Sequence, residues 1–259
     1  MGYVSSSLRK EQATRLRHNM RRFLLSSDAI DFCLTKAPAK TLDFIDDLFI
    51  RESERRIQAR KANMVKSAGF PTIKSLDDYD FREVTMPSSM THEQMLNLDF
   101  ITAKNSLVMV GVCGSGKTML SICLGLKACA MEYKVKFVTL AQLAMKLKTS
   151  ADEGRLEHTL LQLRKLDLLI IDEWGYCQLD RESAGYIFRV IADSYERKSL
   201  IITTNLPFSE WGKIVADEQL AAAIIDRIVH YGHLIDTGTK DWRVVNSPMN
   251  KTQVVELRK

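Results

Sequence analysis

A glycine-rich segment that ends in Lys-Thr constrains this chain more than any other feature. Residues 111–118 read Gly-Val-Cys-Gly-Ser-Gly-Lys-Thr and match the P-loop pattern G-x-x-x-x-G-K-T. The apolar residues 106–110 before it predict a buried strand, and residues 117–132 after it predict a helix. Because a phosphate-binding loop requires that order of elements, the sequence predicts a site for a nucleoside triphosphate with Mg²⁺.

The residues of this loop have distinct expected roles. Gly111, Gly114 and Gly116 let the backbone wrap a phosphate without Cβ clashes, and the helix N-terminus that follows favours an anion. Lys117 is expected to reach the β- and γ-phosphates, and Thr118 to bind Mg²⁺. The other expected nucleotide contacts are Val112, Cys113, Ser115 and Met119. We interpret Cys113 as a tolerated small residue rather than a nucleophile.

A second apolar strand, residues 168–171, ends in two carboxylates. Asp172 is expected in the Mg²⁺ shell, and Glu173 is placed to orient or polarise the attacking water. The alternative is that both residues only end a strand. The presence of a P-loop favours the catalytic interpretation.

Two further strands surround this pair of motifs. Residues 135–138 lie between them, and residues 199–205 follow them. This layout is typical of the additional-strand, catalytic-glutamate NTPases, of which AAA+ proteins are a branch. Asn205 is then expected to contact the γ-phosphate or its water, although Asn before Leu-Pro also suits a plain turn. The predicted fold class is α/β: a P-loop NTPase of the AAA+ type with a parallel sheet and helices on both faces.

The region after Asn205 is too short for a full AAA+ lid, so we expect the lid to be truncated or absent. Residues 217–231 predict a helix with Asp217 as N-cap, and 233–236 and 242–245 predict short strands. Arg227 is expected to enter a neighbouring subunit's ATP site, the alternative being a structural charge at the helix end. Arg243 is a candidate second nucleotide sensor.

Composition excludes several classes of protein. The chain is 46% hydrophobic and 27% charged, which is ordinary for a globular protein. It has no run of 18 apolar residues, so we expect no membrane association and a cytoplasmic location. Five scattered cysteines without a C-x-x-C pair indicate a reducing compartment and no zinc site.

Positive charge is concentrated in two stretches before the core, residues 8–22 and 51–66, within a net charge of +5. Such stretches suit contact with DNA phosphates, although a solvated basic face is the usual meaning of a charge run. Two helices expected at 139–149 and 155–166 carry further cations. The candidate DNA-binding residues are Arg51, Arg55, Arg56, Arg60, Lys61, Lys146, Lys148 and Arg155.

Four regions follow along the chain. Residues 1–70 predict an all-α DNA- or partner-binding region, 71–90 an extended linker, 91–247 the ATPase core and 248–259 a polar tail. Helices are expected at 8–25, 28–36 and 41–67, the last with Leu42, Ile45, Leu48 and Phe49 on one face. Thr91 and Gln94 form a capping box that opens the core.

Together these motifs make the chain resemble the IstB-type ATPases, helpers of a bacterial insertion-sequence transposase that are similar to DnaC-type helicase loaders. The resemblance covers roughly residues 38–247. It rests on residues 42–48 (Leu-Asp-Phe-Ile-Asp-Asp-Leu), 68–81, the P-loop, 168–176, 205–208 (Asn-Leu-Pro-Phe) and 226–228 (Asp-Arg-Ile).

The resemblance implies an ATP-dependent homo-oligomer that grips duplex DNA through its backbone, without reading sequence, and presents it to a cognate transposase. ATP and Mg²⁺ would lie between subunits, with Arg227 of one subunit near Lys117, Asp172 and Glu173 of the next. No acidic nuclease constellation exists outside the ATP site, so we expect no DNA cleavage by the chain itself.

Three other interpretations share parts of this pattern. A DnaC-like helicase loader has the same core, and the dense positive charge of residues 51–66 favours DNA over a helicase as the partner. A non-enzymatic ATP switch is disfavoured by the retained catalytic residues. A small-molecule kinase would need an acceptor pocket and a cluster of lid arginines, and the sequence indicates neither.

Overall fold

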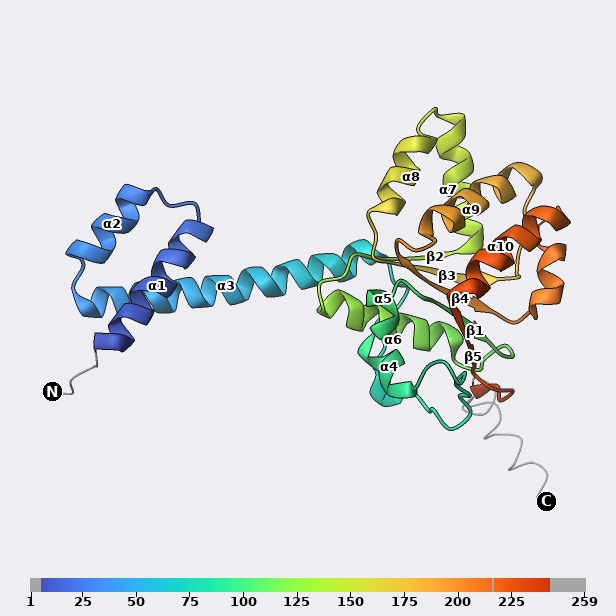
Figure 1. The fold of residues 1–259 in the computed structure, drawn as a ribbon, viewed down its shortest axis with the longest axis horizontal. Helices are drawn as coiled ribbons and strands as arrows, with labels where there is room; N and C mark the ends of the chain where they lie inside the picture. The colour runs from blue at the N-terminus through green and yellow to red at the C-terminus, as the bar shows by residue number, and fades with distance from the viewer. Residues whose placement is uncertain (1–5, 216, 243–259) are drawn as a thin grey trace, which may run out of the picture. The chain divides into compact units, whose positions relative to one another are not determined.

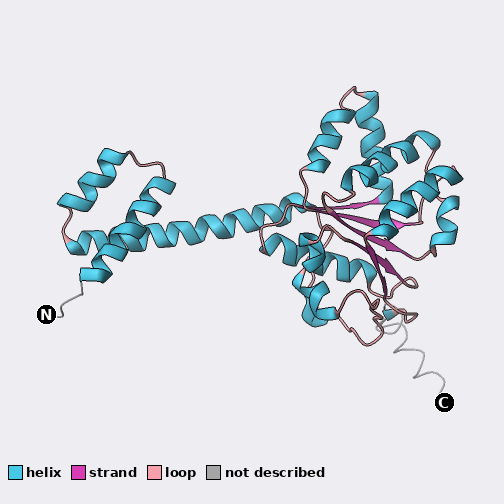
Figure 2. Cartoon of the chain, in the orientation of Figure 1, coloured by secondary structure: helices cyan, strands magenta, loops and turns pink. Residues whose placement is uncertain are grey.

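The computed structural model describes residues 6–215 and 217–242, with side chains from Lys10 onward (Figures 1 and 2). The chain divides into two compact units, Met1–Ala62 and Asn63–Lys259. The division falls inside a helix, whereas the expected helical region extended to residue 70. Among the described residues, no helix is both long enough and apolar enough to cross a bilayer.

The N-terminal unit is built from three helices: α1 (Ser6–Arg22), α2 (Ser27–Lys36) and the first part of α3 (Ala39–Ala68). The side chain of Ser26 accepts a hydrogen bond from the Ala29 N–H and starts α2. The small core consists of the buried Leu16, Met20 and Ile30, with Cys33, Leu34, Leu42, Ile45 and Phe49 packed against it.

One expectation for α3 is wrong. Leu48, expected on the buried face, is 52% exposed. At about 100° per residue it lies too far around the helix from Leu42 and Phe49 to face the same core. Asp46 takes the inner position instead and is 3% exposed. It accepts hydrogen bonds from the Arg15 guanidinium, which raises the pKa of Arg15.

The C-terminal unit is built around a parallel sheet with the strand order β2-β3-β4-β1-β5 (Figure 1). The strands are β1 (Ser106–Val110), β2 (Val135–Thr139), β3 (Leu168–Trp174), β4 (Ser199–Thr204) and β5 (Gly232–Asp236). This arrangement confirms the predicted α/β fold, with β4 lying between β3 and β1, the strand that leads into the P-loop.

Alternate residues of each strand point to opposite faces of the sheet, so apolar side chains occur on both faces. Helices cover both of these faces. Leu169 and Ile171 of β3 belong to one cluster, whereas Leu168 and Ile170 belong to the other. The first cluster includes α7 (Leu140–Asp152), α8 (Leu156–Arg164), α9 (Arg181–Ser194) and α10 (Glu218–His230). The second includes α4 (His92–Asn97), α5 (Asp99–Thr102) and α6 (Lys117–Ala130).

Two helix starts match their sequence signals. Thr91 and Gln94 form the expected capping box at α4. Asp217 accepts a hydrogen bond from the Leu220 N–H and starts α10. Of the expected strand at 242–245 only Trp242 is described; Arg243 and the tail at 248–259 lie outside the described residues.

Residues 71–90, which were expected to form an extended linker, pack against the core of the C-terminal unit. They contain one short turn, η1 (Leu76–Asp78), and Val84 and Met90 are buried in the core. Thr85 pairs with Asp236 at the outer edge of β5. The apolar residues are irregularly spaced among polar ones, so no periodicity reveals this packing in the sequence.

Candidate nucleotide-binding site

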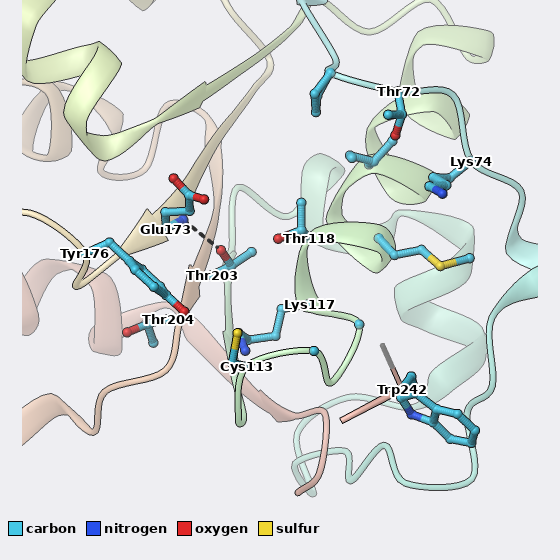
Figure 3. A pocket seen from close by; sticks show the side chains of 15 residues that line it. Thr72, Lys74, Cys113, Lys117, Thr118, Glu173, Tyr176, Thr203, Thr204 and Trp242 are labelled. Atoms are coloured by element: carbon cyan, nitrogen blue, oxygen red, sulfur yellow. Dashed lines mark hydrogen bonds between the residues drawn. The ribbon is translucent and has the colours of Figure 1, made fainter. Parts of the chain in front are cut away.

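A pocket of about 540 Å³ lies where β1, β3 and β4 end (Figure 3). In parallel α/β sheets, ligands bind at this carboxyl edge. The lining residues come from four parts of the C-terminal unit: Pro71, Thr72 and Lys74; Cys113, Gly114, Gly116, Lys117, Thr118, Met119 and Ile122; Glu173, Tyr176, Thr203 and Thr204; and Trp242.

The P-loop connects Val110 at the end of β1 to Lys117 at the start of α6. Gly114 and Gly116 have φ angles of +79° and +95°, a region that favours glycine. A Cβ on Gly116 would lie 2.9 Å from the Tyr79 ring. The expected contact Ser115 lies beneath the loop, where its hydroxyl is 2.7 Å from that of Thr237. The loop is therefore packed on Tyr79 and Thr237, and the Trp242 N–H donates to the Gly114 carbonyl at 3.1 Å.

Lys117 is held inside this loop. Its ammonium group donates to the carbonyls of Gly111 and Val112 at 2.8 and 2.7 Å, and the residue is only 8% exposed. The α6 N-terminus begins at the same residue, so the cation and the helix dipole favour an anion at one place. This geometry fits the phosphates of a nucleotide.

Thr118 and Asp172, the two residues expected to bind Mg²⁺, contact each other. The Thr118 hydroxyl donates to the two Asp172 carboxylate oxygens at 2.9 and 3.1 Å. Asp172 is 4% exposed. A carboxylate and a hydroxyl are hard oxygen ligands, the type that Mg²⁺ prefers, so this pair fits a phosphate-bound Mg²⁺.

Glu173 reaches the pocket from an irregular point in β3. Its φ angle is +60°, which is uncommon for a residue other than glycine. The pairing of β3 with β4 shifts between Ile171 and Trp174 at this point. The Glu173 N–H donates to the Thr203 hydroxyl at 3.1 Å (Figure 3), and the side chain is exposed in the pocket. A carboxylate in this position can act on a water beside a bound phosphate.

Asn205 lies one residue beyond β4 and is exposed. A Cβ on Gly175 would be 3.2 Å from its side-chain oxygen, so Asn205 lies beside the turn after β3. Thr203 and Thr204, rather than Asn205, line the pocket. Its role as a γ-phosphate sensor stays a prediction.

Several lining residues were missed by the sequence motifs. Tyr176 follows Glu173 closely, and Pro71, Thr72 and Lys74 fall in the segment taken as a linker. The P-loop pattern carries no information about them, because they reach the pocket through the fold. A search for polar residues at the ends of all predicted strands could have found Thr203 and Thr204.

Arg227 lies at the opposite edge of the sheet from the P-loop. It lines a small depression with Ser106 and Leu200, at the starts of β1 and β4. Its guanidinium donates to the Ala223 carbonyl at 2.9 Å and lies 4.8 Å from the Phe188 ring centre. Arg227 therefore cannot reach the pocket of its own chain.

The candidate DNA-binding residues fall in two places. In the N-terminal unit, Arg51, Arg55, Arg56, Arg60 and Lys61 are carried by α3. Arg56 pairs with Glu52 at 2.8 Å and lies over the Phe23 ring. In the C-terminal unit, Lys148 pairs with Asp180 at 2.7 Å, Arg155 pairs with Glu153, and Lys146 lines an open hollow beside α7. Exposed pairs of this kind are weak, so DNA phosphates can compete for these cations.

Comparisons with known proteins agree with this geometry. A family model described as IstB-like ATP binding protein matches residues 32–249. The ATP-binding protein of insertion sequence IS5376 from Geobacillus stearothermophilus is 36% identical over 75% of this chain and 76% of its own length. The corresponding protein of IS232 from Bacillus thuringiensis is 33% identical over 84% of this chain and 86% of its own length. The crystal structure of DnaI covers 69% of this chain and 92% of its own length at 18% identity, with a TM-score of 0.52, and shares the fold.

Proposed function

This chain belongs to the IstB-like ATP-binding proteins, and on that premise we propose that it binds ATP with Mg²⁺ and hydrolyses it. The observation that carries this proposal is the meeting of Lys117, Thr118, Asp172 and Glu173 around one pocket. A pocket that only held ATP as a switch would need the metal ligands Thr118 and Asp172 but not the second carboxylate, Glu173.

The chemistry follows from these positions. Lys117 and the α6 N-terminus stabilise negative charge on the phosphates. Thr118 and Asp172 would hold Mg²⁺, which when bound neutralises part of the triphosphate charge. The exposed Glu173 carboxylate orients a water toward the γ-phosphate and accepts its proton as the new P–O bond forms and ADP leaves.

The pocket is proposed to be completed by a second copy of the chain. Among its described lining residues the cations are Lys74 and Lys117, and none is an arginine. Arg227 lies at the far edge of the sheet, where a neighbouring subunit could receive it. An arginine supplied across an interface stabilises transition-state charge and accelerates phosphoryl transfer strongly. This supports a homo-oligomer with shared ATP sites.

We propose that this oligomer binds duplex DNA. The candidate cations of α3 and of the α7–α8 region would contact the DNA phosphates. The relatives are named for insertion sequences, so we propose that the assembly delivers DNA to the transposase of such an element. Hydrolysis would then be stimulated by DNA and by that transposase.

The test combines ATP turnover with sedimentation, with and without random-sequence duplex DNA. We expect duplex of any sequence to induce an ATP-dependent assembly and to stimulate turnover. Glu173→Gln should bind ATP and stay assembled, and Arg227→Ala should keep ATP affinity but lose stimulation. Mixing the two inactive variants should restore turnover, because some interfaces then carry both Glu173 and Arg227.

The matched control is Arg181→Ala, which removes an exposed arginine from the start of α9 and should behave like the unaltered chain. Failure of mixed variants to regain turnover would assign Arg227 a structural role. A response to single strands or to a hexameric helicase, without any response to duplex, would replace the transposition function with helicase loading.

A further inference from the structure

We propose that Thr203 is a positioning residue that couples the metal ligand Asp172 to the catalytic Glu173 through its single hydroxyl group. This inference rests on the proposed ATP hydrolysis and adds a residue that no motif identifies. Thr203 lies on β4, next to the end of that strand, and is 2% exposed.

The register of the sheet explains why this hydroxyl is needed. Ile171 pairs with Ile202, and Trp174 pairs with Thr204. Two residues of β3, Asp172 and Glu173, therefore face the single residue Thr203 of β4, which is the arrangement of a β-bulge. The left-handed φ of Glu173 belongs to this bulge.

The Thr203 hydroxyl makes two hydrogen bonds of opposite direction. It accepts from the Glu173 N–H at 3.1 Å and donates to the Asp172 carboxylate. A bulge interrupts the ladder of backbone hydrogen bonds, and here a side chain supplies the acceptor for Glu173. The same oxygen thus fixes the backbone of the catalytic residue and the orientation of the metal ligand.

This bridge has a consequence for Mg²⁺ binding. Thr118 also donates to Asp172, but Thr118 is itself a proposed Mg²⁺ ligand. Thr203 is set deeper, at 2% exposure, and the bond that its hydroxyl donates holds the Asp172 carboxylate from the side of the sheet. Partners that orient a metal ligand typically change metal affinity or activity by about 10–100-fold when they are removed.

Two variants separate the hydroxyl from the shape of the side chain. Thr203→Val keeps the shape and removes both hydrogen bonds, whereas Thr203→Ser keeps the hydroxyl. We expect T203V to lower kcat by at least about tenfold, with KM for ATP changed by less than about threefold. T203S should stay within about twofold of the unaltered chain in both values.

A second readout does not depend on turnover. Trp174 follows Glu173, is fully buried and lies 4.8 Å from the Trp211 ring, so its fluorescence reports on the bulge. Trp242 lines the pocket and would add its own signal, so all variants carry Trp242→Phe. In a titration with Mg²⁺ and a non-hydrolysable ATP analogue, T203V should need about tenfold more Mg²⁺ for the half-maximal change.

Thr159→Val is the matched control, because Thr159 is 9% exposed and donates to Ser150 at 2.9 Å, outside the pocket. It should lower stability without moving the Mg²⁺ titration. Should T203V fail to fold, Thr203→Cys offers a weak donor of similar size and should show the same shift. A T203V or T203C titration that overlaps that of T159V overturns the proposal. If the unaltered chain binds Mg²⁺ and the analogue but hydrolyses no ATP, the proposed ATPase function is refuted. The role of Thr203 is then still decided by the Mg²⁺ titration.

Discussion

The two units of this chain differ most in how much apolar surface they bury. The N-terminal unit has a core of three fully buried side chains, Leu16, Met20 and Ile30. The C-terminal unit packs large clusters on both faces of a five-stranded sheet. A small core gives little stability, so the N-terminal unit depends on each of its few contacts, including the ion pair of Arg15 with Asp46.

The units also use charge differently. In the nucleotide pocket, Lys117 and Asp172 are almost completely buried and tightly bonded. On α3, cations such as Arg55 are exposed. Burial strengthens electrostatic interactions and suits a reaction with fixed geometry, whereas exposed cations suit a DNA backbone that can be bound in many registers. The proposed chemistry therefore uses the buried charges of the C-terminal unit, whereas the proposed DNA contact uses exposed cations such as those of α3.

Removal of the buried Lys117 ammonium group should give the largest effect. This effect should be confined to the C-terminal unit. Lys117→Ala is expected to lower ATP affinity by at least about 100-fold, because a charge-assisted contact to the phosphates is lost. Calorimetric titration with Mg²⁺ and ATP measures it, and circular dichroism confirms folding. Lys127→Ala, at the other end of α6, is the control. Unchanged ATP binding by K117A would contradict the assignment of residues 111–118 as a P-loop.

The second-largest effect is expected in the stability of the N-terminal unit. Ile30→Ala is expected to destabilise that unit by about 2–5 kcal/mol, because Ile30 is 1% exposed and its removal leaves a cavity. Hydrogen exchange resolved by peptide should show faster exchange in α1 and α2, with ATP affinity within about twofold of normal. Equal loss of protection in β1 and β3 would show that the two cores are not separate.

The smallest effect concerns one exposed cation. Arg55→Ala is expected to weaken duplex binding by a few-fold, equally for all sequences, and to reduce the slope of log affinity against log salt by about one. Fluorescence anisotropy at several salt concentrations measures both. Lys40→Ala removes an exposed cation from the start of the same helix and should leave the slope unchanged. A loss confined to one DNA sequence would contradict backbone recognition.

Local signals made much of the fold predictable. The strands β1, β3 and β4 contain short apolar runs, and the capping groups Thr91 and Asp217 mark helix starts that the structure confirms. The P-loop residues and Asp172 could be placed because their spacing is set by a strand, a loop and a helix in sequence. These features depend on residues close together in the chain.

Features that depend on distant residues could not be predicted. The partnership of Thr203 with Asp172 and Glu173 arises from a register shift between two strands. The burial of Asp46 depends on an arginine from another helix. Division of the chain inside α3 has no local signal, because helix propensity continues across residue 62.

The packing of residues 71–90 decides where the chain can be cut. Tyr79 touches Gly116 closely enough to exclude a Cβ there, and Thr72 and Lys74 form one wall of the pocket. A fragment that begins at residue 91 would expose the apolar surface under Val84 and lose that wall. We therefore expect a fragment that keeps the nucleotide pocket intact to begin near Asn63, and exchange of N-terminal units to be tolerated before that point rather than after it.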